Sequence, residues 1–205
     1  MGNQTNVEQP SKQESRKHIH EDVIGKVRYR VYRNVTLKGV DFKVQFFRDE
    51  SRKGKKWLAE TFFHEDMVNV AKAATASYIY LRDNTDCVFG PVVPEVVKVI
   101  PVNESAKSPP AHMVQVGDVL GSVFENTSPA GKVYHKFSFC RAEKIFEEDW
   151  FFNNFRPEDL SHVAQAATAC RMWYDENIGS VRRRAVTEEG EEKRPAKRKP
   201  RRAAK

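Results

Sequence analysis

The sequence predicts an α+β fold of two tandem repeats, each with three antiparallel strands, or four, followed by one helix. The first observation behind this is a duplication, because Trp57 to Leu81 returns as Trp150 to Tyr174 at a shift of 93 residues. The second is that alternating apolar and polar residues in each repeat give way to a helical period. Two copies are too few for an open solenoid, so we expect a closed pseudo-two-fold pair.

The duplication also sets the expected boundaries. Upstream of the tryptophans the match continues at a shift of 92, pairing Gly25 with Gly117 and Asn34 with Asn126. We expect repeat 1 at residues 23–82 and repeat 2 at residues 116–176. A polar leader at 1–22 and a basic tail at 177–205 are expected to be disordered, because they lack the apolar residues that repay the entropy of ordering.

A proline-rich linker, residues 83–115, is expected to join the repeats. Its stretch Val92–Val102 is apolar enough to dock as an extended edge segment. The pattern leaves open whether this stretch is a strand.

Three strands are expected in repeat 1, at Ile24–Arg33, Val40–Arg48 and Lys56–Phe62. The first places Val27 and Val31 on one face and Arg28 and Arg30 on the other, as a half-buried strand does. The second places Phe42, Val44 and Phe46 on one face and Lys43, Gln45 and Phe47 on the other. Repeat 2 has matching strands at Gly117–Asn126, Lys132–Arg141 and Trp150–Asn154.

A helix ends each repeat. The first begins after Glu65-Asp66 and the second after Glu158-Asp159, where negative charge suits the positive end of the helix dipole. The expected buried stripes are Met67, Val70, Ala71, Ala74, Tyr78 and Leu81, and Leu160, Val163, Ala164, Ala167, Arg171 and Tyr174. Each stripe is expected to pack on its own sheet, with contact between the two helices as the alternative.

Charge is distributed unevenly along the chain. The formal net charge is +7, and Ile178–Lys205 alone carries 11 Lys or Arg and four Glu. Gly25–Val68 has a net charge of +5, whereas Gly117–Leu160 has a net charge of −3. If one repeat contacts a polyanion, it is therefore repeat 1.

The motifs of common enzymes are missing from the sequence, so we expect neither catalysis nor a cofactor. There is no phosphate-binding Gly-rich loop, no H-E-x-x-H and no nucleophile elbow. Three cysteines without close spacing indicate neither a disulfide framework nor a zinc site and fit a reducing compartment. The acidic pairs at the helix starts could bind metal, but capping of backbone N–H groups is favoured, and no metal is expected.

Neither a membrane span nor a lipid anchor is expected, since no apolar run is long enough and Asn6 replaces the Ser or Thr of a myristoylation motif. The predicted location is the cytoplasm or the nucleoid. In a nucleated cell it would be the nucleus, because Lys193–Arg202 would serve as an import signal.

The strongest functional signal is the basic and aromatic surface expected on repeat 1. Its candidate residues are Lys26, Arg28, Arg30, Tyr32, Lys43, Phe47, Arg52, Lys53, Lys55 and Lys56. The tail adds Arg182, Arg183, Arg184, Lys197, Arg198, Lys199, Arg201 and Arg202. Basic groups interleaved with rings can follow a phosphate backbone while stacking exposed bases, although a solvated outer sheet face has the same pattern. Trp57 and Trp150, with Phe62 and Phe155, are interpreted as core anchors rather than as stacking platforms.

The duplicated strand-rich unit that ends in one helix resembles the Whirly, Pur and single-stranded-DNA-binding coactivator group. This resemblance covers both repeats and implies two interlocking units whose sheets bind single strands, with four strands before each helix. The segments Tyr32-Arg33-Asn34 and Phe155-Arg156-Pro157-Glu158-Asp159-Leu160 also resemble short uncharacterised bacterial repeats. That second resemblance implies no function.

The sequence therefore predicts a protein that binds nucleic acid, with single-stranded DNA or RNA favoured over duplex because no recognition helix is evident. The alternative is a protein-interaction or scaffold module that uses acidic, aromatic Phe146–Phe155 in repeat 2 to bind a partner. In that case the basic tail only localises the assembly to nucleic acid.

Overall fold

The computed structural model describes residues 18–37, 39–89, 95–103, 105, 107–145 and 148–179. Repeat 1 contains β1 (His18–Ile24), β2 (Val27–Thr36), β3 (Gly39–Arg52), β4 (Lys55–Ala59), η1 (His64–Asp66) and α1 (Met67–Asn84). After β5 (Lys98–Val99), repeat 2 contains β6 (His112–Val116), β7 (Val119–Thr127), β8 (Val133–Ile145), β9 (Glu148–Phe152), β10 (Asn154–Phe155), η2 (Pro157–Asp159) and α2 (Leu160–Tyr174). The chain divides into a unit that ends at Cys170 and a C-terminal unit that begins at Arg171. In the latter, η3 (Asp175–Gly179) follows α2.

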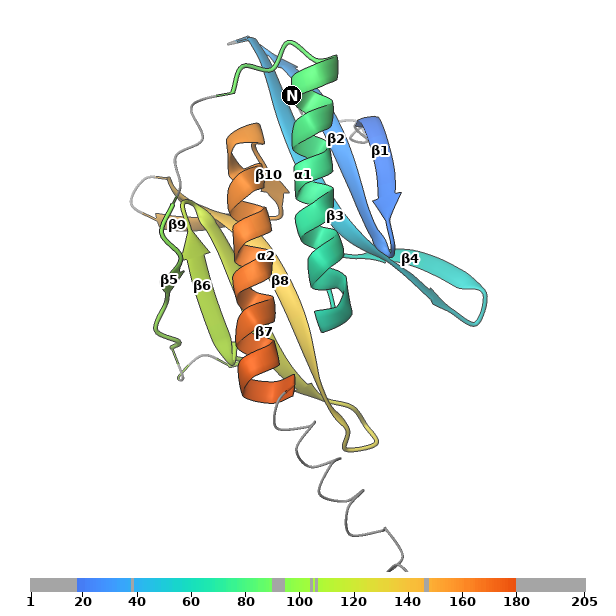
Figure 1. The fold of residues 1–205 in the computed structure, drawn as a ribbon, viewed down its shortest axis with the longest axis vertical. Coiled ribbons are helices and arrows are strands. Elements are labelled where there is room, and N and C mark those ends of the chain that lie inside the picture. The colour runs from blue at the N-terminus through green and yellow to red at the C-terminus, as the bar shows by residue number, and fades with distance from the viewer. Residues whose placement is uncertain are drawn as a thin grey trace, which may run out of the picture. The chain divides into compact units, whose positions relative to one another are not determined.

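Two antiparallel sheets form the first unit and confirm the predicted α+β class. The first sheet has the order β1-β2-β3, with both β4 and β10 paired to β3. The second has the order β5-β6-β7-β8-β9 (Figure 1). A tight turn at Gly25-Lys26 joins β1 to β2, and Gly25 there has a φ of 64°. Glycine suits this position because it adopts positive φ without steric cost.

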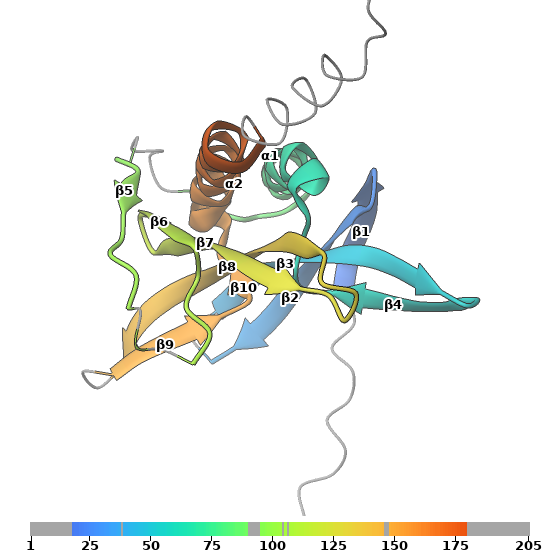
Figure 2. The ribbon, with the colours of Figure 1, turned by 90° about the horizontal axis from the view of Figure 1, so that it is seen from below.

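Each sheet buries one face against its own helix. In β2 and β3 the buried residues alternate with half-buried ones as predicted, and the buried set includes Val27, Val31 and Val44. Helix α1 contacts β1, β2 and β3. In repeat 2, His162 of α2 lies against Gly117 and Cys170 lies against Gly121 of β7. Figure 2 shows α1 and α2 on the same side of the strands, so neither of these two helices covers the opposite face.

The buried helix stripes differ in part from the prediction. Met67, Val70, Ala74 and Leu81 are buried as expected, whereas Ala71 and Tyr78 are only half-buried. Ala73 and Ser77 are buried instead, both at 0% exposure. In α2, Ala164 and Arg171 are likewise only half-buried, and Ala166 and Cys170 are buried at 0% exposure. The periodicity was therefore correct, but the apolar stripe is rotated toward small residues, which let the helix approach its sheet closely.

The two repeats exchange short segments in a reciprocal way. Phe155 of β10, in repeat 2, pairs with Val44 of β3 in repeat 1. Phe62, in repeat 1, forms an antiparallel bridge with Phe137 of β8 in repeat 2. The shift of 93 residues relates Phe62 to Phe155 and Val44 to Phe137. The repeats are therefore interlocked about a pseudo-two-fold axis, as the sequence predicts.

Two strands lie where the sequence predicts leader and linker. His18–Asp22, assigned to the disordered leader, belong to β1, and His112–Gln115, assigned to the linker, belong to β6. Repeat 1 therefore has four strands before its helix, and repeat 2 has four, β6 to β9, followed by the two-residue strand β10. In the apolar linker stretch, Lys98–Val99 forms the short strand β5 against β6. Residues 1–17 and 180–205, which carry most of the expected leader and tail, lie outside the described residues.

Candidate nucleic-acid interface

The helix-free face of the first sheet carries the side chains that the alternation predicts. Arg28, Arg30 and Tyr32 come from β2, and Lys43 and Phe47 come from β3. In the register of the two strands, Arg28 lies opposite Phe47 and Tyr32 lies opposite Lys43. All five are half-buried, on the side away from the core residues. The structure therefore brings this part of the candidate site together.

Two carboxylates of the same sheet neutralise the arginines on this face. Arg28 donates from both Nε and Nη2 to Asp49 of β3, each at 2.8 Å. Arg28 and Arg30 also both donate to Glu21 of β1. The hydrogen bond from Arg30 lowers the pKa of Glu21, and that from Arg28 lowers the pKa of Asp49, so both carboxylates stay ionised. The two arginines are thus already paired within the protein, which the sequence pattern did not indicate.

The two rings of this face and Lys43 also have neighbours within the sheet. The Arg30 guanidinium carbon lies 5.5 Å from the centroid of the Phe47 ring. The His18 ring meets Tyr32 edge-on, with centroids 6.3 Å apart. Lys43 Nζ lies 3.8 Å from an Asp41 carboxylate oxygen. This central part of the face is therefore a network of internal contacts rather than a row of free cations.

The exposed cations among the candidate residues of repeat 1 lie at one corner, which we call the cationic corner. It consists of Lys26 in the β1–β2 turn and of the β3–β4 hairpin residues Arg52, Lys53, Lys55 and Lys56, all of them exposed. The backbone N–H of Asp49 donates to the carbonyl of Lys26 at 2.8 Å, which links the two hairpins. The hairpin projects beyond α1 (Figure 1).

The turn of this hairpin has an unusual backbone. Lys53 has a φ of 51° and Gly54 a φ of 78°, as in a two-residue type I′ turn. Lys53 is the one non-glycine residue with positive φ in the described part of the chain. Asn or Gly is preferred at such a position, so Lys53 adopts this backbone conformation at an energetic cost.

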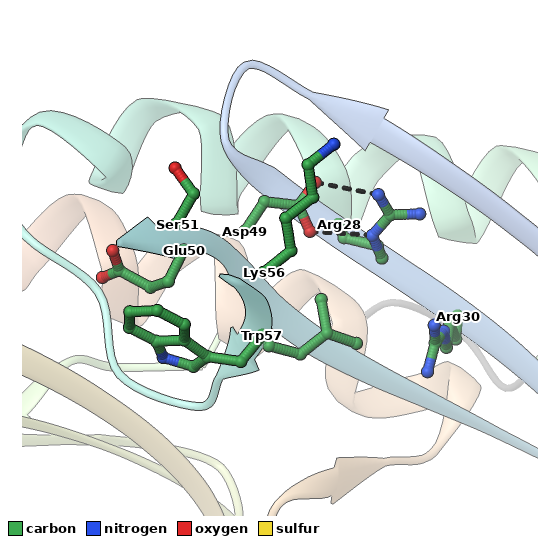
Figure 3. Close-up of a pocket in the computed structure, with 8 residues that line it drawn as sticks. Arg28, Arg30, Asp49, Glu50, Ser51, Lys56 and Trp57 are labelled. Atoms are coloured by element: carbon green, nitrogen blue, oxygen red, sulfur yellow. Dashed lines mark hydrogen bonds and ion pairs between the residues drawn. The ribbon is translucent and has the colours of Figure 1, made fainter. Parts of the chain in front are cut away.

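A hollow of about 410 Å³ lies beside the cationic corner (Figure 3). Its wall is formed by Arg28, Arg30, Asp49, Glu50, Ser51, Lys56, Trp57 and Leu58. The Trp57 side chain is 46% exposed, and Lys56 next to it extends to the same hollow. The hollow therefore combines an accessible ring with cations that can bind phosphate and carboxylates that can accept hydrogen bonds.

The interpretation of the tryptophans as core anchors was wrong. Trp57 is 46% exposed and Trp150 is 49% exposed, whereas Phe62 and Phe155 are buried as expected. The reason is geometric, because β4 pairs only with the end of β3, from Arg48 onward, where the hairpin leaves the part of the sheet under α1. The sequence repeat located the tryptophans but could not show which of the aromatic residues lie in the core.

The acids at the helix starts have the structural role that was expected. Asp66 Oδ2 accepts the Phe63 N–H at 3.0 Å and the Arg48 Nε–H at 2.6 Å. Asp159 repeats this arrangement at the start of α2, where its Oδ2 lies 3.6 Å from Arg141 Nε. Burial raises the pKa of Asp159. These aspartates therefore hold buried arginines rather than mark a surface site.

Other chemistry has little support in the described part of the chain. Burial raises the pKa of the Cys170 thiol to about 12, so that it stays protonated at neutral pH. Among the described residues, no group of three or more His, Cys, Asp or Glu is placed to hold a metal ion. Neither α1 nor α2 has the length and apolarity that crossing a lipid bilayer requires.

The candidate residues of the tail, from Arg182 to Arg202, lie outside the described residues. Comparison with known proteins finds no family model that matches the chain and no similar curated protein.

Proposed function

We propose that this protein binds single-stranded nucleic acid, DNA or RNA, at the cationic corner and the adjoining hollow. The observation that carries the proposal is Trp57, a large ring that is 46% exposed beside Lys56 in a hollow of about 410 Å³. A base stacked on this ring would remove its exposed apolar surface from water, which favours binding.

Electrostatics supports an anionic ligand at this corner. Lys26, Arg52, Lys53, Lys55 and Lys56 are all exposed, and lysine or arginine side chains supply most of the affinity for a phosphate backbone. Their spread over two linked hairpins matches an extended chain of phosphates better than a single small anion. The basic tail adds a sequence-independent attraction of the same kind.

A single strand suits the site better than a duplex. Stacking on Trp57 needs a base whose face is accessible, and bases within a duplex are already stacked on their neighbours. In the described part of the chain, α1 and α2 bury their apolar stripes against the sheets. Four strands precede α1, and in repeat 2 four strands, β6 to β9, come before the short β10 and α2; four is the number in the Whirly, Pur and coactivator group that the sequence resembles.

The binding test uses a labelled single-stranded 20-mer and fluorescence anisotropy. Replacing Lys55 and Lys56 with glutamate should weaken binding by about a hundredfold, because two attractive contacts become repulsive. Replacing Trp57 with alanine should weaken it by about tenfold, as expected for the loss of one stacked base. A duplex of the same sequence should bind more weakly than the single strand.

Trp150→Ala is the matched control, since Trp150 is equally exposed at the equivalent position of repeat 2. It should leave oligonucleotide affinity unchanged. Deleting residues 182–205 should flatten the dependence of affinity on salt without abolishing binding. If the protein without its tail binds no oligonucleotide, the proposed site is wrong and only the tail attracts nucleic acid.

Glu21→Gln should strengthen oligonucleotide binding by about fivefold. Glu21 bridges Arg28 and Arg30, so removing its charge leaves more positive charge available to the bound nucleic acid. The expected gain in binding free energy is about 1 kcal/mol at a solvated site. The control is Asp22→Asn, which changes the net charge equally at an exposed residue that accepts a hydrogen bond from the Val23 N–H. Equal gains in oligonucleotide affinity for the two variants would show that only net charge matters and that Arg28 and Arg30 do not contact the nucleic acid.

A further inference from the structure

The two repeats carry opposite charges at equivalent corners. In repeat 1, β4 begins with Lys55-Lys56 before Trp57, and in repeat 2, β9 begins with Glu148-Asp149 before Trp150. The backbone pairing is the same, because Trp57 lies opposite Glu50 of β3 and Trp150 lies opposite Glu143 of β8. One backbone arrangement thus presents a tryptophan beside lysines in one repeat and beside carboxylates in the other.

The equivalent corner of repeat 2, at β9, exposes more aromatic surface than the cationic corner of repeat 1. Trp150 is 49% exposed and Phe151 is 61% exposed. Its counterpart in repeat 1, Leu58, is only half-buried and lines the hollow. The next ring, Phe152, lies 5.2 Å from the buried Arg141 guanidinium and is therefore already occupied. Consecutive residues of a strand point to opposite faces, so the two exposed rings lie on the two faces of β9, which is the last strand in the order of its sheet. Exposed rings on both faces of an edge strand mark a surface that a partner covers.

The charges around these rings decide which partner fits. Glu148 and Asp149 are exposed, and Glu147 precedes them in the sequence. Lys144 lies opposite Asp149 and offsets part of this charge, whereas Glu148 lies opposite the uncharged Ile145. Glu143 is bound by Arg141 and Arg156. The remaining negative charge would repel phosphates but attract lysine or arginine side chains, which also bind to the faces of tryptophan and phenylalanine.

We propose that Glu148, Asp149, Trp150 and Phe151 form a docking surface for a lysine- or arginine-rich segment of another protein. An extended segment along the edge of β9 would place alternate cationic side chains on its two faces, over Trp150 and near Glu148 on one face and over Phe151 and near Asp149 on the other. General attraction is not enough to explain such binding, because this chain has a formal net charge of +7 and repels a polycation overall. The protein would then hold a nucleic acid at one corner and a basic protein at the other.

The probe is a fluorescein-labelled octalysine peptide, titrated with the full-length protein and followed by anisotropy. Glu148→Lys/Asp149→Lys, which copies the Lys55-Lys56 sequence of repeat 1, should weaken binding by about tenfold or more. Trp150→Ala/Phe151→Ala should weaken it to a similar extent. Lys55→Glu/Lys56→Glu, the reverse exchange in repeat 1, should not weaken it. Thermal melts establish that the three variants are folded.

Unchanged octalysine affinity in both repeat 2 variants would overturn the proposal. Sedimentation velocity tests whether a second copy of this chain occupies the surface instead. A dimeric wild type that becomes monomeric in Trp150→Ala/Phe151→Ala would also overturn it. Oligonucleotide binding is measured on the same variants. The proposed docking surface in repeat 2 can therefore fail without affecting the proposed nucleic-acid site of repeat 1, which is tested by its own variants.

Discussion

Replacing Asp66 with alanine should destabilise the fold by about 3 kcal/mol, because the buried Arg48 guanidinium would lose its buried counter-charge and keep only the more exposed Glu50. Arg48 is 5% exposed and Asp66 is 2% exposed. The same carboxylate oxygen that accepts the Arg48 Nε–H also accepts the Phe63 N–H, and the Phe63 ring centroid lies 4.4 Å from the guanidinium carbon. Removing the Asp66 carboxylate therefore leaves the buried Arg48 with Glu50 as its remaining partner and leaves the helix start uncapped.

Urea denaturation measures this loss as a change in the free energy of unfolding. Glu65→Ala is the matched control, because Glu65 is the exposed acid next to Asp66, and its removal should change stability by less than about 0.5 kcal/mol. Replacing the pair together, as Arg48→Met/Asp66→Leu, should recover most of the lost stability, since neither charge is then stranded. A loss below about 1 kcal/mol for Asp66→Ala would contradict the buried ion pair.

Phe137→Ala should cost about 3–5 kcal/mol, the usual range for a large side chain removed from a core. Phe137 is fully buried, and its backbone exchanges two hydrogen bonds of 2.8 Å with Phe62 of the other repeat. The substitution leaves a cavity where the repeats interlock. Both repeats should therefore lose stability together.

Thermal unfolding followed by circular dichroism and by tryptophan fluorescence checks this prediction. The variant should unfold in one transition, with the two signals coinciding and the midpoint lowered. Phe124→Ala is the control, since Phe124 is half-buried on the helix-free face of β7 and should cost clearly less. Two separate transitions would show that the repeats fold independently, contrary to the exchanged pairing.

Much of the fold could be predicted from sequence because the duplication gives two copies of the same residue pattern, and each copy supports the interpretation of the other. Alternation in β2 and β3, the helices and the pseudo-two-fold pairing all follow from it. The strand β1 could not be predicted, because its sequence His18–Ile24 is polar and none of its residues is buried. It is held by the ladder to β2, by the ion pairs of Glu21, and by the His20 ring stacked on Tyr80 with centroids 3.8 Å apart. All of these depend on tertiary structure.

The candidate site was predicted in composition but not in detail. The two-residue alternation correctly placed Arg28 and Arg30 on the helix-free face of the first sheet. The carboxylates that neutralise them, however, come from β1 and from the end of β3. Such pairing between strands depends on register, which one sequence does not specify. The exposure of Trp57 was missed for a related reason, since its burial depends on how far the helix extends over the sheet.

The reciprocal pairing of Phe62 with β8 and of β10 with β3 means that neither half of this chain is a self-sufficient module. Each half has an open edge that only the other fills. Severing the connection between Asn84 and His112 would therefore leave two fragments that stay associated, much as two subunits of a dimer do. A gene duplication that fused such subunits would free one half to reverse its surface charge while the other kept its own.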